Sequence, residues 1–453
     1  MASGGVRNTS WQEGPRSFRD IDPWSQGYDQ PTELAHKFVG LEWGGRNIPP
    51  QILYKVDKLM TEQKLTLIDL FAGCGGLSLG LEQAGFTSIM VNELNADARQ
   101  SYLMNRKNQK IIETDDIKGI VKALNSSTRM SNIIKDMHSI GDIDLIAGGP
   151  PCQGFSGIGG RRSYSVDKEQ LPSNYLYEDM AFVISKLQPK MFLFENVQGL
   201  LSSKWTSSGT KGEIWEDIQL AFQSIDSYRI EWKLIYSKDY GVPQNRPRVV
   251  MVGIRNDVDS RSNGLIPTGN YAPPTLQELW GDLIDPDYEN GGETVRYPIE
   301  PQNDLQKRLR GQSTWITEHK YSKHAPRIVE KFQYMIENNG EIPEEMKTKK
   351  FAQRLLSPNW DKNGPNITAT SLADDYVHWA QPRSLTVREI ARLQMFPDSY
   401  QFAGKRTTGG TKRAGNPREG QFDRELPKYT QIGNAVPVEL ARHIGNHLKT
   451  LIT

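Results

Sequence analysis

The chain has 453 residues, of which 24% are charged and 37% are hydrophobic, and its formal net charge is +1. This length and composition fit a soluble globular protein of two or three domains, and a charge so near zero excludes a uniformly basic surface, so nucleic-acid binding requires local clusters of Lys and Arg. The two cysteines, Cys74 and Cys152, stand 78 positions apart and provide neither a metal-binding spacing nor a disulfide framework, which suits a reducing cytoplasm.

Residues 1–63 form a polar stretch with scattered aromatic residues, in which seven basic residues stand against eight acidic ones. This charge balance argues against a DNA-binding arm, so we expect a partly ordered N-terminal extension whose aromatic side chains pack on the main domain. No basic-then-apolar signal pattern opens the sequence, and no apolar run approaches the roughly 18 residues that a membrane span needs. We therefore expect a soluble, cytoplasmic protein with no membrane partner.

Strands and helices alternate between residues 64 and 257, the first predicted domain. Short β-rich apolar runs predict strands at Leu65–Leu70, Ser88–Asn92, Ile143–Ala147, Met191–Phe194, Ile230–Tyr236 and Val249–Ile254. Apolar residues at helical spacing predict helices at Gly75–Ala84, Asn95–Met104 and Tyr175–Leu187. This alternation predicts an α/β fold with a doubly wound, mostly parallel sheet that is covered on both faces.

The alternation fails after Asp257. Residues 258–382 show turn signals, irregular apolar spacing and four tryptophans, and we interpret them as a second, smaller and irregular domain. Residues 383–453 return to regular structure and are assigned to the first domain again.

Two helices and a loop are expected in this last part of the chain. Thr386 and Glu389 form a capping box that opens a helix through Met395, and a final helix begins near Pro437. The loop 404–428 is rich in Gly and basic residues, and it is either a surface that attracts DNA phosphates or a solvated insertion. The basic residues expected to provide such attraction are Lys405, Arg406, Lys412 and Arg413.

A glycine-rich turn leads from the first strand into the first helix, with the sequence Asp-Leu-Phe-Ala-Gly-Cys-Gly-Gly-Leu at residues 69–77. Its glycines let a ligand approach the backbone, and the helix N-terminus favours a negative group. Glu93 ends the next strand, 20 residues after Gly73, where an acid can hold both ribose hydroxyls of a nucleoside, and Asp116 suits an adenine amino group. The GxGxxG spacing is absent, which favours S-adenosylmethionine over NAD.

Three further stretches carry candidate catalytic residues. Cys152 follows the strand at Ile143–Ala147 within Gly-Pro-Pro-Cys-Gln-Gly-Phe-Ser, and we interpret it as a nucleophile because ligands bind at the carboxyl ends of parallel strands. Glu195 ends another apolar strand, where partial desolvation favours the protonated acid and makes it a candidate proton donor. Arg246 and Arg248 stand two apart in an extended segment, so both guanidinium groups are expected to reach one polar site.

Together with Gln-Ile-Gly-Asn-Ala-Val-Pro at residues 431–437, these stretches resemble the successive motifs of the C5-cytosine-specific DNA methyltransferase family over roughly residues 64–255 and 383–453. The resemblance implies a Rossmann-like, S-adenosylmethionine-dependent catalytic domain without a metal. It makes residues 258–382 the target-recognition domain. The cofactor-binding residues that it implies are Phe71, Gly73, Gly75, Glu93, Leu94, Asp116, Ile117, Pro151, Leu176, Asn434 and Val436.

The resemblance also implies a mechanism. Cys152 attacks C6 of a flipped-out cytosine, Glu195 acts at N3, and Arg246 with Arg248 surrounds the base and its backbone. The methyl group passes from S-adenosylmethionine to C5, leaving S-adenosylhomocysteine. The glycine-hinged loop 154–174 is then a lid over the site.

The substrate is expected to be duplex DNA, with the enzyme acting as a monomer. A cognate restriction endonuclease is a partner if the enzyme belongs to a restriction–modification system, and none is needed if the methyltransferase is solitary. A relative that modifies tRNA by the same chemistry and a non-catalytic DNA-binding adaptor are alternatives. The first is disfavoured by the size of 258–382, the second by the complete set of Cys152, Glu195 and Arg248. An NAD-dependent oxidoreductase fits only if the glycine-rich turn is taken alone.

Overall fold

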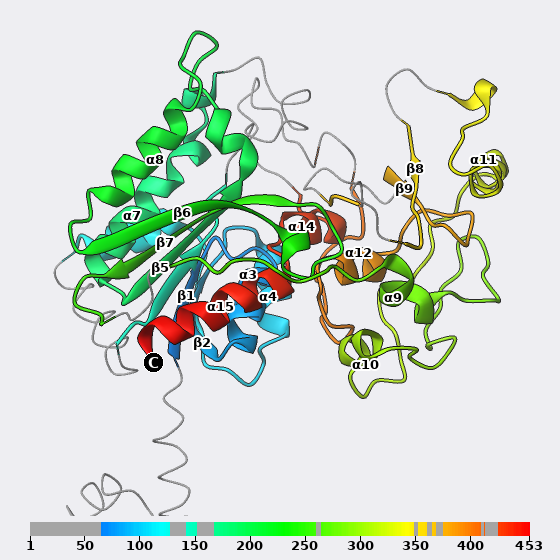
Figure 1. The fold of residues 1–453 in the computed structure, drawn as a ribbon, viewed down its shortest axis with the longest axis horizontal. Helices are drawn as coiled ribbons and strands as arrows, with labels where there is room; N and C mark the ends of the chain where they lie inside the picture. The colour runs from blue at the N-terminus through cyan, green and yellow to red at the C-terminus, as the bar shows by residue number, and fades with distance from the viewer. Residues whose placement is uncertain are drawn as a thin grey trace, which may run out of the picture. The chain divides into compact units, whose positions relative to one another are not determined.

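A seven-stranded sheet organises the protein in this computed structural model, which describes residues 65–126, 142–151, 167–259, 264–347, 352–359, 365–367, 375–408, 412 and 425–453. The strand order is β3-β2-β1-β4-β5-β7-β6 (Figure 1). The strands are β1 (Leu65–Leu70), β2 (Phe86–Asn92), β3 (Ile112–Thr114), β4 (Leu145–Gly148), β5 (Met191–Val197), β6 (Tyr228–Tyr236) and β7 (Pro247–Arg255).

Strands β1 to β5 pair in parallel, and β7 runs antiparallel to both of its neighbours, β5 and β6. The strand order reverses between β1 and β4, which is the place where ligands bind in open α/β sheets. The predicted doubly wound, mostly parallel sheet is therefore confirmed.

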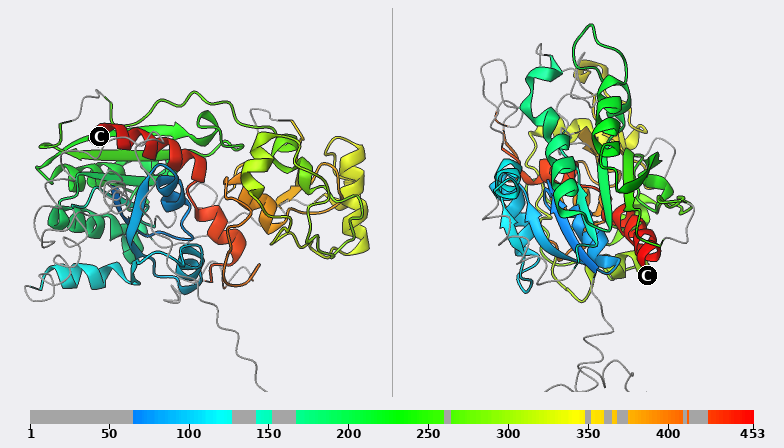
Figure 2. Two further views of the ribbon diagram at one scale, coloured as in Figure 1. Left: turned by 90° about the horizontal axis from the view of Figure 1, so that it is seen from below. Right: turned by 90° about the vertical axis from the view of Figure 1, so that its left-hand side faces the viewer.

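Helices cover both faces of the sheet. Side chains of a strand alternate between its faces, and Leu65 and Leu67 of β1 belong to one buried cluster whereas Ile68 and Leu70 belong to another. The first cluster includes α3 (Gly76–Gln83) and α15 (Val438–Ile452), and the second includes α5 (Ile117–Leu124), α7 (Leu176–Leu187) and α8 (Glu213–Gln223). Figure 2 shows α15, in red, beside the sheet in both of its views.

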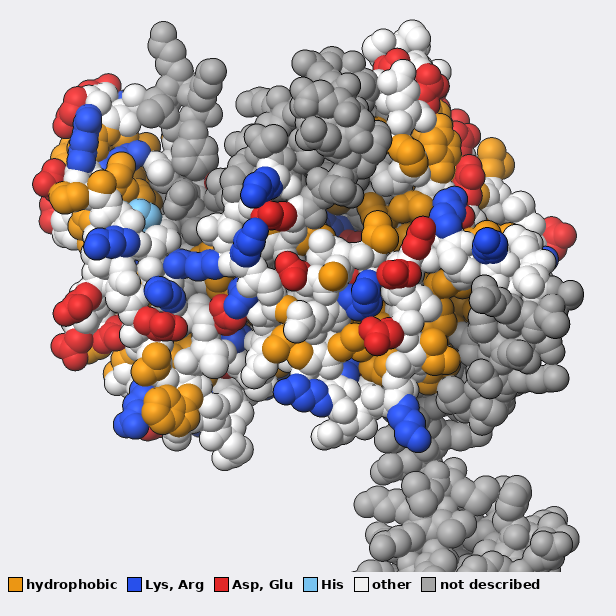
Figure 3. Space-filling view, turned by 180° about the vertical axis from the view of Figure 1, so that it is seen from behind, with side chains coloured by type: hydrophobic (Ala, Val, Ile, Leu, Met, Phe, Trp, Pro, Cys, Tyr) orange, Lys and Arg blue, Asp and Glu red, His pale blue; other side chains and the backbone are white. Residues whose placement is uncertain are grey.

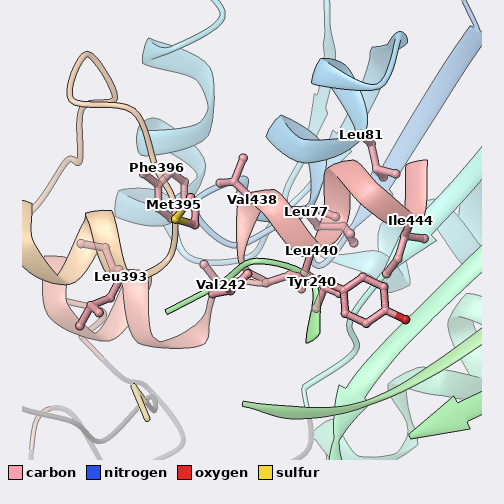
Figure 4. Packing of buried hydrophobic residues seen from close by; sticks show 14 of the residues in the cluster. Leu77, Leu81, Tyr240, Val242, Leu393, Met395, Phe396, Val438, Leu440 and Ile444 are labelled. Atoms are coloured by element: carbon pink, nitrogen blue, oxygen red, sulfur yellow. The ribbon is translucent and has the colours of Figure 1, made fainter. Parts of the chain in front are cut away.

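The final helix α15 packs on α3 at the start of the chain's described part. Leu77 and Leu81 of α3 share the buried cluster with Val438, Leu440 and Ile444 of α15 (Figure 4). The expectation of a last helix near Pro437 that returns to the sheet is met, because α15 begins at the following residue. The chain end is thus fixed against the turn that follows β1.

Among the residues that the structure describes between β7 and α12 (Val387–Leu393), there is little regular structure, as the irregular apolar spacing predicts. The described elements of this part are the α-helices α9 (Leu276–Trp280), α10 (Asp304–Arg310) and α11 (Pro326–Glu337), the short 3-10 helices η7 (Gly281–Leu283) and η8 (Glu344–Met346), and the two-residue strands β8 (Arg354–Leu355) and β9 (Tyr376–Val377). Figure 1 shows α9 next to α12, and the two helices are in contact.

A buried polar network joins α9 and α12. Arg392 of α12 donates to Asp282 and to Asp398, with Nη1 2.6 Å from Oδ1 of Asp282 and Nη2 2.5 Å from Oδ2 of Asp398. Trp280 donates from its indole nitrogen to the carbonyl of Glu389 at 3.1 Å. A boundary at residue 383, as expected from the sequence, therefore divides residues that share one buried network.

Local sequence signals place several of the helix ends. Thr386 and Glu389 form the predicted capping box. The helix that follows ends at Leu393 instead of Met395, because Met395 has a φ of 62° and leaves the helical conformation. Two further α-helices among the described residues are α4 (Ala96–Met104), which Asn95 caps, and α14 (Lys428–Asn434). Within the described residues, no helix is long and apolar enough to cross a membrane.

Candidate active site

The carboxyl ends of five strands meet along one edge of the sheet. Leu70 at the end of β1 pairs with Asn92 of β2 and with Gly148 of β4. Asn92 in turn pairs with Thr114 of β3, and Gly148 pairs with Phe194 of β5. The residues that follow these positions include Gly73, Glu93, Asp116, Pro151 and Glu195, so the structure brings the predicted cofactor and catalytic stretches to one edge.

The turn after β1 has an unusual backbone. Phe71, Gly73 and Gly75 all have positive φ angles, of 57°, 57° and 87°. No atom lies within 4 Å of a Cβ added at Gly73, so space is open beside this residue. A Cβ added at Gly75 would lie 2.8 Å from side-chain atoms of both Tyr102 and Tyr400. Gly73 therefore leaves room for a ligand. At Gly75, a glycine is needed because any larger residue would collide with Tyr102 and Tyr400.

Glu93 holds this turn through its carboxylate. Its Oε2 accepts a hydrogen bond from the backbone nitrogen of Gly73 at 2.8 Å, and its Oε1 accepts one from Asn95 at 2.7 Å. Burial raises the pKa of Glu93, although both hydrogen bonds and Arg99 act in the opposite direction. Each carboxylate oxygen has a second lone pair, so the group can still accept hydrogen bonds from ribose hydroxyls. Leu94 beside it is 72% exposed.

The other predicted cofactor residues lie on neighbouring elements. Asp116 is exposed and caps α5, with Oδ1 2.9 Å from the nitrogen of Lys118. Ile117 is buried, and the partly buried Leu176 packs against the same cluster.

Residues 434–436 approach the cofactor turn from the C-terminal part of the chain. Asn434 is exposed at the end of α14, and Val436 is buried. A Cβ added at Gly76 would lie 2.4 Å from the carbonyl oxygen of Val436, so the 434–436 segment lies against the start of α3. The structure thus brings the late motif and the first glycine-rich turn together.

Cys152 and residues 153–166, which include most of the predicted lid, lie outside the described residues, but the backbone that leads to Cys152 is placed. Nδ2 of Asn196 donates to the carbonyl of Pro150 at 3.2 Å. A Cβ added at Gly149 would lie 3.1 Å from Oε2 of Glu195. Pro151 is exposed. The segment before Cys152 therefore packs directly against Glu195 and Asn196 of β5.

Glu195 and Arg248 form an ion pair, with Oε1 and Nε 2.6 Å apart, and both side chains are about nine-tenths buried. Burial lowers the pKa of Arg248, and the charge of Glu195 opposes this shift. Arg246 is 1% exposed and has other hydrogen-bond partners, the backbone carbonyls of Gly433, Ala435 and Ile367. The two arginines were expected to serve one polar site, and the structure gives them separate hydrogen-bond partners.

Two residues that form hydrogen bonds with segments of the candidate site, Asn196 and Gln394, were not singled out by sequence reasoning. Asn196 directly follows Glu195, and its amide side chain next to a candidate acid is the sequence feature that could have indicated a contact with the site. Gln394 links several segments by hydrogen bonds, and nothing in its local sequence indicates this.

The second cysteine, Cys74, is buried. Its sulfur lies 3.4 Å from the carbonyl oxygen of Gln431, and burial raises the pKa of its thiol to about 12.

The described residues of the basic loop are tied to neighbours. Lys405 and Lys412 both lie near Glu425, with Nζ–Oε1 distances of 3.0 and 3.9 Å. Arg406 donates to Ser322 and Tyr429. Arg413 and residues 414–424 lie outside the described residues. On the face drawn in Figure 3, Lys and Arg side chains lie among Asp and Glu side chains, in keeping with the net charge of +1.

Comparison with known proteins identifies the family. A model of the C-5 cytosine-specific DNA methylase family matches residues 65–450. The chain is 33% identical over 400 residues to the type II methyltransferase M.DdeI of Desulfomicrobium norvegicum, covering 85% of this chain and 88% of that protein. It is 32% identical over 390 residues to the type II methyltransferase M.PspPI of a Psychrobacter species, covering 84% and 78%.

Among solved structures, a prophage-encoded protein of E. coli assigned as a DNA modification methyltransferase is similar, with a TM-score of 0.61 and 25% identity, over 85% of this chain and 99% of that one. The family match and the sheet agree with each other. The chain belongs to the C-5 cytosine-specific DNA methylase family and is a DNA cytosine-5 methyltransferase.

Proposed function

We propose that this enzyme methylates carbon 5 of a flipped-out cytosine in a specific duplex DNA sequence, through a covalent bond between Cys152 and C6 of the base. The observation that carries the proposal is the Glu195–Arg248 ion pair, which lies against the backbone leading to Cys152. A carboxyl group and a guanidinium group beside the backbone that leads to Cys152 suit the chemistry proposed for cytosine.

C5 of cytosine is a poor nucleophile, so the enzyme has to raise the electron density at C5 before the methyl group can be transferred. The Cys152 thiolate forms a bond to C6. In the reacting state Glu195 carries a proton taken from solvent and donates it to N3, so that electron density moves to C5 as an enamine. Arg248, held beside Glu195, faces the O2 acceptor of the base. After C5 has gained the methyl group, a water molecule takes the C5 proton, the C5–C6 double bond re-forms as the bond between C6 and sulfur breaks, and N3 returns its proton to Glu195. A stacked base does not expose C6 to a thiol, so the cytosine has to leave the helix.

S-adenosylmethionine supplies an electrophilic methyl group to this reaction. The open space at Gly73, the exposed side chain of Leu94 and the free lone pairs of Glu93 fit such a cofactor. Glu93 would hold the ribose hydroxyls and Asp116 the adenine amino group. The other residues proposed to line the cofactor are Phe71, Ile117, Pro151, Leu176, Asn434 and Val436. Gly75 is instead proposed to let the turn pack closely on Tyr102 and Tyr400.

Residues 258–382 are proposed to read the DNA sequence. Their irregular structure and their length support a recognition surface that faces a groove, and duplex DNA is favoured over tRNA for that reason. The relatives M.DdeI and M.PspPI are type II methyltransferases, which favours a restriction–modification system with a cognate endonuclease. We propose a monomer that acts in the cytoplasm.

Methylome sequencing after expression in a methylation-free host tests this proposal. The expected result is 5-methylcytosine at one position of one short sequence, and no new 5-methylcytosine in the host's tRNA. Methylation of adenine, of the cytosine amino group or of tRNA alone would contradict the proposal. The Cys152→Ser variant, expressed at the same level, is the matched control and should leave the DNA unmodified.

A further inference from the structure

Arg246 is a buried cation with an unusual set of partners. It is 1% exposed and stands directly before β7, two residues from Arg248. Its Nη2 donates to the carbonyls of Gly433 at 2.9 Å and Ala435 at 3.1 Å, and its Nη1 donates to the carbonyl of Ile367. Within the described part of the chain it makes no ion pair, whereas Arg248 pairs with Glu195.

Two of the accepting carbonyls, those of Gly433 and Ala435, belong to the segment that lies against the start of α3. α14 ends at Asn434, and the last carbonyls of a helix have no partner within the helix. A cation at this end also matches the negative pole of the helix dipole. The guanidinium group of Arg246 therefore holds the backbone of residues 433–435. This backbone carries Asn434 and leads to Val436, and Arg246 itself stands two residues before Arg248 of the Glu195–Arg248 pair.

A second side chain supports the same segment. Nε2 of Gln394 donates to the carbonyls of Ile432 at 2.8 Å and Ala435 at 3.2 Å, so Gln394 and Arg246 share one acceptor. The backbone oxygen of Gln394 accepts from the nitrogen of Val438 at 2.9 Å, at the start of α15. These groups are buried, and an unsatisfied buried carbonyl destabilises its surroundings, so the segment has little freedom to move.

Arg246 and Gln394 are linked through Gln244. Nε2 of Gln244 donates to Oε1 of Gln394 at 2.8 Å and to the carbonyl of Leu393 at the same distance, and its Oε1 accepts from the nitrogen of Ile367. The turn that leads into β7 thereby holds three segments together: residue 367, the end of α12 and residues 432–435.

The electrostatics agree with a role inside the protein. Two guanidinium groups, Arg246 and Arg248, lie near one carboxylate, Glu195. Burial and the like charge of Arg248 hold the pKa of Arg246 well below its usual range. The carbonyl dipoles, together with the charge of the nearby Glu195, offset the charge of Arg246. A side chain that is 1% exposed is also poorly placed to meet a phosphate on the surface of DNA.

We propose that Arg246 is a positioning residue that fixes the 433–436 segment, and with it the cofactor, relative to the Glu195–Arg248 pair. This differs from the contact with the base or its backbone that the sequence suggested for Arg246. The inference rests on the proposed function, since it presumes that Asn434 and Val436 border S-adenosylmethionine and that Glu195 and Arg248 border the cytosine.

The test compares Arg246→Lys with wild-type full-length enzyme. Lysine keeps the charge but replaces a planar fork by a single ammonium, so it cannot bind the three carbonyls in the same geometry. S-adenosylmethionine affinity, measured by calorimetry without DNA, should weaken by about tenfold or more. The KM for S-adenosylmethionine should rise by a similar factor, with a smaller change in kcat at saturation. The salt dependence of DNA binding should keep the wild-type slope. Arg229→Lys is the matched control, because the side chain of Arg229 is exposed on β6, and it should change none of these.

The opposite pattern would overturn the inference. If Arg246 contacts a DNA phosphate, Arg246→Lys leaves the cofactor affinity unchanged, and neutral Arg246→Met lowers the log–log salt slope by about 0.9. A loss of packing alone would lower the melting temperature and the active fraction but leave the affinity of the active fraction for S-adenosylmethionine unchanged, which also contradicts a positioning role.

A second variant keeps the test decisive if Arg246 variants do not fold. Gln394→Met removes a neutral donor to the same Ala435 carbonyl and should weaken S-adenosylmethionine binding in the same direction without touching the salt slope. Unchanged binding in Gln394→Met would contradict the coupling. Failure of the proposed function is distinguishable, because the wild-type enzyme itself would then neither bind S-adenosylmethionine nor methylate DNA.

Discussion

Arg248 and Glu195 meet across two antiparallel neighbouring strands, with Nε and Oε1 2.6 Å apart. Arg248 of β7 pairs in register with Val197 of β5, so Glu195 is its diagonal neighbour on the same face. Diagonal neighbours are within reach of long side chains such as arginine. The register of the sheet therefore builds the ion pair, and the same register places it beside the backbone that leads to Cys152.

Glu195→Gln should lower kcat by about 10²–10⁴, because the amide cannot supply a proton to N3 as the enamine forms. S-adenosylmethionine affinity should stay within about twofold of wild type, since Glu195 lies on the cytosine side of the site. Single-turnover methylation and calorimetry on the same preparation measure the two effects. Turnover within tenfold of wild type would show that N3 is activated by another group.

The two cysteines should differ sharply in function. Cys152→Ser should reduce methyl transfer to background while DNA binding persists, because a hydroxyl is a far weaker nucleophile near neutral pH. Cys74→Ala should retain most activity, because Cys74 is buried with a pKa of about 12 and is not available as a thiolate. Radiolabel transfer measures both variants. An inactive but folded Cys74→Ala enzyme would contradict this division of roles.

Glu93→Ala should weaken S-adenosylmethionine binding by one to two orders of magnitude, measured by calorimetry. The substitution removes the acceptor for the ribose hydroxyls and also the acceptor that holds the nitrogen of Gly73, and hydrogen bonds to a charged group contribute about 1.5–3 kcal/mol. Glu113→Ala on the neighbouring strand β3 is a suitable control, because Glu113 is exposed. An affinity equal to that of wild type in Glu93→Ala would place the ribose elsewhere.

The elements that bury a continuous apolar pattern could be predicted from the sequence. β1 spans Leu65–Leu70 as expected, because all six residues are buried in a parallel strand and form an uninterrupted β-rich run. The sequence of α8 also carries a helical pattern, because Ile214, Ile218 and Phe222 are apolar and four residues apart, but we predicted no helix there. α14 has no comparable signal. Its residue Gln431 donates from its side chain to the carbonyl of Ala403, which lies in another segment of the chain.

Some features of the candidate site could likewise be predicted from the sequence, and others could not. Strand ends meet at one edge of any parallel sheet, so the proximity of Gly73, Glu93 and Glu195 follows from the order of the motifs. The roles of Gly75 and Arg246 do not follow from it. The first packs against Tyr102 and Tyr400, and the second binds carbonyls nearly 190 residues away in the chain. Such contacts depend on how distant segments pack, and no local pattern encodes them.

Asp69 should make stability depend on pH. It is buried, and burial raises its pKa from 3.8 to about 7, although Ser78 and Arg106 lower it and Glu82 and Glu93 raise it further. At a pH between these two pKa values, Asp69 keeps its proton in the folded state but has lost it in the unfolded chain. This contribution to the free energy of unfolding therefore falls as pH rises from about 4 to 7, by up to about 1.4 kcal/mol per pH unit, and levels off above pH 7.

Asp69→Asn removes this titration and keeps an oxygen that can accept from Ser78. Urea unfolding of the cofactor-free protein at pH 5, 6, 7 and 8 measures the effect. The stability of wild type relative to the variant should decrease from pH 5 to 7. Asp257→Asn is the control, because the pKa of the exposed Asp257 is lowered and its charge is constant over this range. Parallel curves for wild type and Asp69→Asn would show that Asp69 does not titrate there.

A covalent trap tests the central claim most directly, once the methylome has given the target sequence. A duplex with 5-fluorocytosine at the target position presents no proton at C5, so the enzyme cannot eliminate after methyl transfer and stays bonded to C6. The account predicts a complex stable to denaturant that requires S-adenosylmethionine, with the modified peptide carrying the base on Cys152. The absence of such a complex with active enzyme, or its formation by Cys152→Ser, would contradict the account.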